Sequence, residues 1–173
     1  MVSGRAAPAA PAVTGPAVDA GSFRQVMGRL ATGVTLVATR FDGVDHVMTA
    51  NSFTSVSLDP PLVLFCVRRG SRFHHAVLAS GVWGVSVLPA AMEDAGRFFA
   101  QPGRPVGGAT RWPCHRGVRG VALFDAALAV LEASTHAVHD EGDHAIVVGA
   151  VTALGPPRDD RPLIYQRGRY RTC

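Results

Sequence analysis

The sequence predicts a mainly β fold, in which an antiparallel sheet curls into a barrel and a few short helices pack around it. Six or more segments have the apolar, β-branched composition of strands, and only two or three short segments show helical spacing. The two kinds of segment do not alternate regularly, which excludes a βα-repeating architecture. With 173 residues, 47% of them apolar, the chain is long enough for one domain with a substantial core.

The first predicted element is a helix that begins at Ser22, a residue type that often caps helices. Its apolar positions recur at helical spacing, at Phe23, Val26, Met27 and Leu30. Residues 34–39 then predict a strand, and Asp42-Gly43 is typical of a tight hairpin turn.

The next strand, predicted over 45–57, carries polar side chains on both faces. Its hydroxyl and amide residues are Thr49, Asn51, Ser52, Thr54, Ser55 and Ser57. Because a buried hydroxyl without a partner costs about 1–3 kcal/mol, such a strand favours a polar ligand, either a phosphate or a polar heterocycle. A solvated Ser/Thr-rich surface loop is the alternative. Asp59-Pro60-Pro61 ends the strand, since prolines lack the backbone donor.

The apolar run at 62–67 predicts a strand that is buried on both faces. Ser71 is positioned to cap a helix over 72–80. The remaining predicted elements are a strand at 82–88, a helix at 92–100, a long loop at 101–117, a long hairpin of 127–139 with 144–154, and a short hairpin of 163–165 with 169–171.

Composition excludes several kinds of site. All 17 cations are arginine, so there is no lysine for a Schiff base or a phosphate loop, and the formal charge of +4 favours anionic ligands. No glycine-rich dinucleotide fingerprint is present, and the histidines and cysteines form no recognisable metal-ligand set. The three cysteines are far apart and odd in number, which does not indicate a disulfide framework.

The chain contains no apolar run long enough to cross a membrane and no pattern of a secretory signal, so we expect a cytoplasmic protein. Residues 1–20 are mostly Ala, Pro, Val and Gly without periodicity, and we expect a disordered leader there. A single domain over 21–173 would follow. Its low charged fraction of 17% suggests that a second subunit covers part of the surface.

Two polar features lie at predicted strand ends. Asp143-His144 opens a strand directly after a glycine turn, which places the imidazole at the rim of the barrel; a solvent-exposed turn histidine is the alternative. Arg68, Arg69 and Arg72 follow a buried strand. With a ligand they are a phosphate clamp, and without one they are a solvated charge group.

Four blocks of the chain, in order, resemble one known family. They are residues 23–37, residues 48–63, Gly142-Asp143-His144, and residues 162–165 with 168–170. Together they are similar to the flavin reductase-like domain family, whose members are the small reductase components of two-component flavin-dependent monooxygenases. The resemblance runs from Phe23 to Tyr170.

This resemblance implies an FMN-binding split β-barrel that forms a homodimer, binds FMN or FAD and reduces it with NADH or NADPH. It also implies that reduced flavin passes to a separate monooxygenase. His144 would be the catalytic residue and would lie against the nicotinamide ring. The flavin would be held by Thr49, Ala50, Asn51, Ser52, Ser55, Cys66, Val67, Arg68 and Ser71, with Phe98 and Phe99 nearby.

The chain departs from the family pattern in two places. Asn51 stands where many relatives carry serine, and Pro105-Val106-Gly107-Gly108 replaces a basic residue followed by Phe-x-Gly. Neither the flavin nor the nicotinamide nucleotide is specified by a sequence motif. A non-catalytic flavin-binding split barrel is the main alternative. A nucleic-acid-binding barrel is disfavoured, because aromatic residues are only 7% and do not alternate with the arginines.

Overall fold

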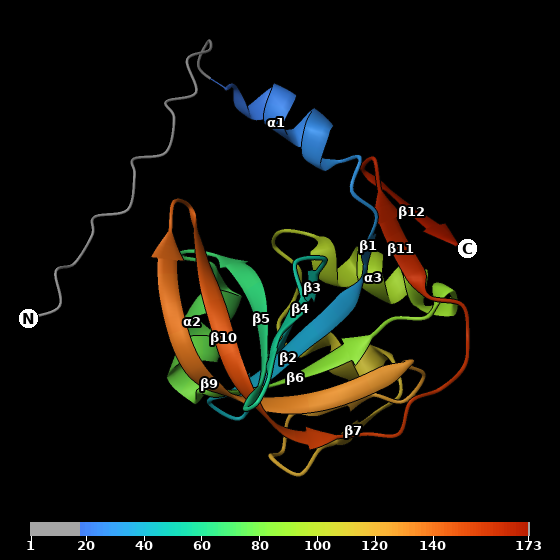
Figure 1. Cartoon of the computed structure of the whole chain (residues 1–173). Coiled ribbons are helices and arrows are strands. Elements are labelled where there is room, and N and C mark those ends of the chain that lie inside the picture. Colours follow the sequence, from blue (N-terminus) through green and yellow to red (C-terminus); the bar gives the residue numbers. More distant parts are fainter. Residues whose placement is uncertain (1–17, 173) are drawn as a thin grey trace, which may run out of the picture.

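The computed structural model describes residues 18–172 and confirms the mainly β fold (Figure 1). One seven-stranded antiparallel sheet dominates it, in the order β3-β2-β6-β9-β10-β5-β4. Its strands are β2 (Thr35–Phe41), β3 (Val44–Ala50), β4 (Thr54–Leu58), β5 (Pro61–Arg68), β6 (Val82–Val87), β9 (Ala129–Glu141) and β10 (His144–Leu154).

The two edge strands of this sheet, β3 and β4, are neighbours in the sequence. A flat sheet of seven strands would hold its edges about 29 Å apart, at ~4.8 Å per strand. Residues 51–53 join the two edges, and a link of that length spans at most about 15 Å. The sheet must therefore curl until its edges approach each other, which gives a barrel whose seam is not closed by strand pairing.

The predicted single strand at 45–57 is thus wrong, because the chain leaves one edge of the sheet at Ala50 and joins the other edge at Thr54. The turn signals on either side are confirmed. Asp42 and Gly43 both have positive φ, 51° and 72°, and connect β2 to β3. Asp59-Pro60 connects β4 to β5, with Leu58 paired to Pro61.

Smaller elements surround the barrel. The helices are α1 (Ala20–Met27), α2 (Arg72–Ser80) and α3 (Glu93–Ala100), with short 3-10 turns η1 (Ala90–Met92) and η2 (Gly108–Arg111). A three-stranded sheet contains β1 (Thr32–Gly33), β11 (Leu163–Gln166) and β12 (Arg169–Thr172), and a hairpin contains β7 (Cys114–Arg116) and β8 (Ala122–Phe124). None of the helices in residues 18–172 has the length and apolar character needed to cross a membrane.

Two helix starts test the capping predictions. Ser71 does cap α2, since its hydroxyl accepts a hydrogen bond from the His74 N–H at 3.1 Å. Ser22 does not cap α1. Asp19 does so instead, because its carboxylate reaches the N–H groups of Gly21 and Ser22 and binds the Ser22 hydroxyl at 2.6 Å. The proposed leader falls largely on residues 1–17, outside the described part of the chain.

The core lies on both sides of β2. Inside the barrel, Phe65 and Trp83 pack edge to face at 4.8 Å, and Phe73 and Val77 of α2 close over them. The opposite face of β2 is covered by α3 and by β8, around Phe99 and Phe124. Every residue of β2 up to Thr39 is buried as a result.

Strand β5 differs from its prediction. Val63, Phe65 and Val67 are buried in the barrel, whereas Leu62 and Leu64 on the opposite face are only partly covered. Strand β5 is therefore not buried on both faces in the single chain. The apolar outer face of β5 is left without a covering layer of its own.

Gly149 of β10 leaves room for the Trp83 ring inside the barrel. A Cβ atom at position 149 would overlap the Trp83 ring, whose Nε1 donates to the Thr135 hydroxyl at 3.2 Å. Trp83 is fully buried, so it has no space into which to move. Gly33, in contrast, has no atom within 4 Å of a Cβ built on it.

We therefore expect Gly149→Ala to lower the free energy of unfolding by about 1–3 kcal/mol, the usual cost of an extra carbon in a packed core. Gly33→Ala is the matched control and should change it by less than about 0.5 kcal/mol. Urea unfolding followed by tryptophan fluorescence measures both. Equal stabilities of the two variants would contradict this account of the Trp83 packing.

Candidate functional site

A cavity of about 620 Å³ lies at the open seam of the barrel. Strand β4 pairs only with residues 61–64 of β5, so residues 65–68 of β5 have no strand on that side. The cavity is bounded by this part of β5, by β3 and its link to β4, by the start of α2, and by the chain at 99–108. Its position is thus a direct consequence of the unequal lengths of β4 and β5.

Two hydroxyl groups of the polar segment hold these walls together. The Ser52 Oγ accepts the Cys66 N–H at 3.0 Å, where the ladder between β4 and β5 would otherwise continue. The Thr49 Oγ1 donates to the Gly96 carbonyl of α3 at 2.7 Å. The Ser52 hydroxyl also donates to the Cys66 carbonyl at 3.5 Å, so both hydroxyls already use their protons within the chain. They do not wait free for a ligand, as the sequence alone suggests, and can offer it only their remaining lone pairs.

The structure brings together most of the predicted site residues. The lining includes Thr49, Ala50, Asn51, Ser52, Cys66, Val67, Arg68, Ser71, Phe99 and His144. Ser55 and Phe98 do not line the cavity of the single chain. Ser55 is exposed on β4, and Phe98 packs against Trp112 at 5.3 Å beneath the Arg111 guanidinium.

His144 lies at the rim, as predicted from the glycine turn before it. The β9–β10 hairpin turns through Gly142, whose φ is 60°, and the register sets His144 beside Arg68 on β5. Its Nδ1 lies 2.8 Å from the Asp143 carboxylate, and this hydrogen bond is the main cause that lowers the pKa of Asp143. When Nδ1 donates to Asp143, Nε2 of the neutral ring is free to accept.

The cavity also contains residues outside the predicted site: Asp45, His46, Arg72 and Arg104. Arg72 belongs to an arginine cluster that the sequence does reveal. Arg104 lies in the long segment predicted as a loop, and only the length of that segment hints at a function. No sequence pattern marks His46 as a site residue, because only the pairing of β3 with β2 places it at the cavity.

The loop at 101–108 lies along the free edge of β3 and forms one wall. The Gly107 N–H donates to the Asp45 carbonyl at 3.1 Å, and the Arg104 Nε donates to the Val47 carbonyl at 3.1 Å. These are the outward-facing carbonyls of an edge strand, which need partners when strand pairing ends. The loop therefore protects the edge and shapes the cavity with the same contacts.

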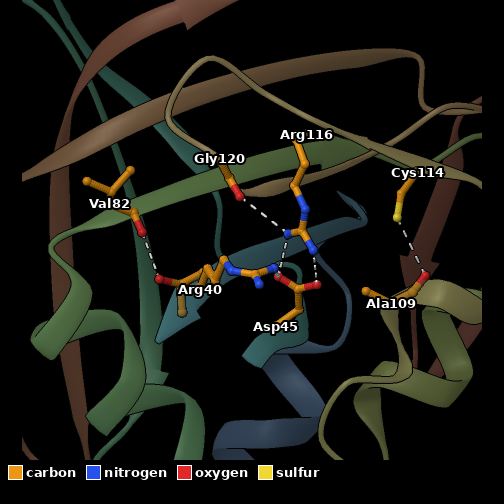
Figure 2. Close-up of polar contacts among 8 residues, drawn as sticks. Arg40, Asp45, Val82, Ala109, Cys114, Arg116 and Gly120 are labelled. Carbon is orange, nitrogen blue, oxygen red and sulfur yellow. Dashed lines mark hydrogen bonds and ion pairs between the residues drawn. The ribbon is translucent and has the colours of Figure 1, made fainter. Parts of the chain in front are cut away.

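Among residues 18–172, Asp45 is the only carboxylate that lines the cavity, and it is already paired (Figure 2). Two nitrogens of Arg116 bind it at 2.6 and 2.7 Å, and Arg40 lies at 3.5 Å. The Asp45 side chain is 9% exposed, and its hydrogen bonds are the main cause that raises the pKa of Arg116. With Asp45 neutralised, Arg68, Arg72 and Arg104 leave the lining positively charged.

Within residues 18–172, no three His, Cys, Asp or Glu side chains are close enough together to hold a metal ion. The chemistry of the cavity is that of arginines, histidines, hydroxyls and backbone groups. Such a donor set suits a ligand that is anionic and partly aromatic.

Comparison with known proteins agrees with this description. Residues 27–173 match the family model described as "Flavin reductase like domain". The chain is 36% identical over 159 residues to the reductase subunit HsaB of a flavin-dependent monooxygenase from Rhodococcus jostii (strain RHA1), covering 92% of this chain and 80% of that protein.

Two solved structures are similar as well. BorF, the flavin reductase component of a bacterial two-component tryptophan halogenase, has 39% identity and a TM-score of 0.84, with 89% of this chain and 98% of that chain covered. The NADH:FAD oxidoreductase SgcE6 of Streptomyces globisporus C-1027, in complex with NAD and FAD fragments, has 37% identity and a TM-score of 0.83, with 88% and 92% covered.

The ion pairs of Asp45 give a stability prediction. Arg116→Gln removes the two short hydrogen bonds to a buried carboxylate, and we expect it to lower the free energy of unfolding by about 1–3 kcal/mol. Arg40 and Arg116 are about equally exposed, but Arg40→Gln removes only a single contact of 3.5 Å and should cost less than about 0.5 kcal/mol. Chemical denaturation of the two variants and the parent distinguishes these effects, and a larger loss for Arg40→Gln would contradict the assignment.

Proposed function

The chain belongs to the flavin reductase-like domain family, and from this premise we propose the way in which its cavity works. The protein is an NAD(P)H:flavin oxidoreductase, which transfers a hydride from a reduced nicotinamide to FMN or FAD. The observation that carries this conclusion is the family match over residues 27–173, whose described part includes every wall of the cavity. The reduced flavin is supplied to a separate monooxygenase.

The residues of the cavity fit a flavin. A volume of about 620 Å³ is in the ordinary range for a site that buries a small molecule. The net positive lining suits a phosphate-bearing ligand, and Phe99 and Val67 supply apolar contact for a ring. A bound flavin supplies the hydride-accepting chemistry itself.

The segment at 49–52, together with Cys66, Val67, Arg68 and Ser71, is proposed to hold the flavin. Ser52 and Thr49 fix the walls through their contacts with Cys66 and Gly96, which leaves backbone groups and remaining lone pairs for the ligand. Ser55 and Phe98 stay in the proposed set from the family resemblance alone.

His144 is proposed to lie against the nicotinamide. Asp143 holds its Nδ1, and the hairpin turn fixes the backbone, so the ring is oriented at the rim of the cavity. Hydride transfer depends mainly on holding two rings in reactive geometry and needs no strong acid, base or nucleophile from the protein. In the described part of the chain, the one carboxylate that lines the cavity is paired with arginine, which agrees with that requirement.

NADH and FAD are the first pair to test. SgcE6, which is similar over most of this chain, is described as an NADH:FAD oxidoreductase. HsaB and BorF are described as reductase components of a monooxygenase and a halogenase, which supports a separate flavin-using partner here.

A homodimer is proposed from the apolar surface that one chain leaves uncovered. Val56 and Leu58 of β4 are 50% and 93% exposed, and β4 pairs with the part of β5 that carries the half-covered Leu62 and Leu64. Helix α1 has no buried residue and lies beside β11 and β12, away from most of the barrel (Figure 1). Patches of this kind usually mark contacts between subunits.

The catalytic proposal predicts that purified protein oxidises NADH in air when FAD is added. His144→Asn should lower kcat/KM for NADH at least 10-fold, because it removes a group proposed to contact the nicotinamide. His139→Asn, at an exposed position of β9 opposite Ile146, is the matched control and should keep the activity within about twofold.

Absorbance at 340 nm follows the reaction with each combination of FAD or FMN and NADH or NADPH. Binding of flavin without oxidation of either nucleotide would instead support a non-catalytic flavin-binding protein. Unchanged kinetics in His144→Asn would remove His144 from the proposed site while leaving the activity intact.

The dimer proposal predicts that Val56→Arg produces monomers, because it places a charge in the proposed contact. Val118→Arg is the control, since Val118 is 88% exposed in a loop on another part of the chain. Size-exclusion chromatography with light scattering measures the mass of both variants. A dimeric Val56→Arg protein, or a monomeric parent, would contradict this interface.

A further inference from the structure

One negative charge lies in the wall of a cavity whose other charged groups are cations. Asp45 contributes it, and no other carboxylate of residues 18–172 lies in the lining, which also contains Arg68, Arg72 and Arg104. The Asp45 side chain is only 9% exposed, so water and salt screen its charge weakly. Asp45 would therefore repel an anionic ligand in the cavity, unless another group cancels its charge.

Arg116 is the group that cancels this charge, and it does so from outside the cavity (Figure 2). It ends strand β7 and does not itself line the cavity. Its Nη1 and Nη2 reach the two carboxylate oxygens of Asp45 at 2.6 and 2.7 Å, as a planar fork. Arg40 adds a single contact of 3.5 Å. The neutrality of this part of the wall thus depends mainly on Arg116.

The hairpin that carries Arg116 is held in place by a buried group of the main sheet. Its turn lies against Glu132 of β9, whose side chain is fully buried and accepts the Arg119 N–H at 2.9 Å. Gly117 comes so close to this carboxylate that a Cβ atom there would overlap it. Arg116 also pairs with Ala122 in the ladder between β7 and β8. Contacts within the chain therefore keep Arg116 at Asp45.

We propose that Arg116 determines how tightly the cavity binds an anionic flavin, because it cancels the charge of Asp45. The identity of the ligand rests on the proposed function, whereas the control of charge rests on the contacts described above. Arg116 is not a catalytic residue, since it acts on the ligand only through Asp45. FMN and FAD carry phosphate charge, so loss of Arg116 weakens their binding. Oxidised riboflavin has the same ring without the phosphate and is much less affected.

His46 reports on the same charge without a ligand. It follows Asp45 on β3 and lines the cavity. Burial is the first cause that lowers the pKa of His46 and the charge of Arg72 is the second, while the Asp45 carboxylate opposes both. Removing Arg116 leaves that carboxylate uncompensated, which should raise the pKa of His46. Removing the carboxylate itself should lower the pKa.

The test is equilibrium binding of FMN and riboflavin to the full chain, measured by isothermal titration. Arg116→Gln should weaken FMN binding about 10-fold, the effect of one unit charge about 10 Å away at an effective dielectric constant of about 20. Riboflavin should bind this variant within about twofold of the parent. Arg116→Lys keeps the charge but loses the fork, so it should keep FMN binding within about threefold.

A double variant separates the effect of charge from that of structure. Asp45→Asn combined with Arg116→Gln lacks the ion pair, as Arg116→Gln does, but leaves no free carboxylate. It should bind FMN within about threefold of the parent, whereas a purely structural role of the pair predicts that it binds as weakly as the single variant. The matched control is Arg97→Gln, which breaks an exposed pair with Glu93 outside the cavity and should keep FMN binding within about twofold.

Three results would overturn the proposal: unchanged FMN binding in Arg116→Gln, an equal loss for riboflavin and FMN, or a double variant that binds as weakly as the single one. If Arg116→Gln does not fold, Asp45→Asn alone decides the question. It should bind FMN at least as tightly as the parent, because it removes the repelling charge, and weaker binding would contradict the proposal.

NMR titration of the His46 ring, with its signal assigned by His46→Gln, distinguishes this inference from the proposed function, since it needs neither flavin nor nicotinamide. A raised His46 pKa in Arg116→Gln, in a protein that never oxidises NADH, would retain the control of charge and reject the function. An unchanged His46 pKa, in a protein that does oxidise NADH, would retain the function and overturn the inference.

Discussion

The link of three residues between β3 and β4 is the constraint on which the rest of the structure depends. It joins strands that lie at opposite edges of a seven-stranded sheet, and so forces the sheet to curl. Because β4 covers only half of β5, the curled sheet has an open seam rather than a closed ladder. Ser52, within the link, binds the Cys66 N–H across the point where pairing stops, and the cavity lies beside it.

The exposed edges of the sheet supply the walls of the site. Backbone groups at a sheet edge need partners, and in this protein those partners are Ser52 for β5 and the loop at 101–108 for β3. The contacts that protect the edges also bring Arg104 to the cavity. The pairing of Asp45 with Arg116 then leaves the arginines of the lining as its dominant charge (Figure 2). Fold stability and ligand chemistry are therefore coupled through the same few residues.

Local features could be predicted from the sequence, and long-range pairings could not. The Asp42-Gly43 turn, the Ser71 cap and the β9–β10 hairpin depend on neighbouring residues, and all are present. The break between β3 and β4 was not predictable, because alternating side chains say nothing about which strand is the partner. Strands β7 and β8 have three residues each, too few for a recognisable period.

The residues of the site also fall into those that the sequence predicts and those that it does not. Residues from the conspicuous polar segment and its neighbours were identified, because they lie near one another in the sequence or in the family blocks. His46 and Arg104 are brought in by the register of β3 and by a loop, so no local pattern marks them. The hydroxyls of Thr49 and Ser52 hold the walls of the cavity together, and the arginines carry its charge. A cavity at an unpaired seam, with charge to attract an anion but no strand to close over it, suits a flavin that must enter oxidised and leave reduced.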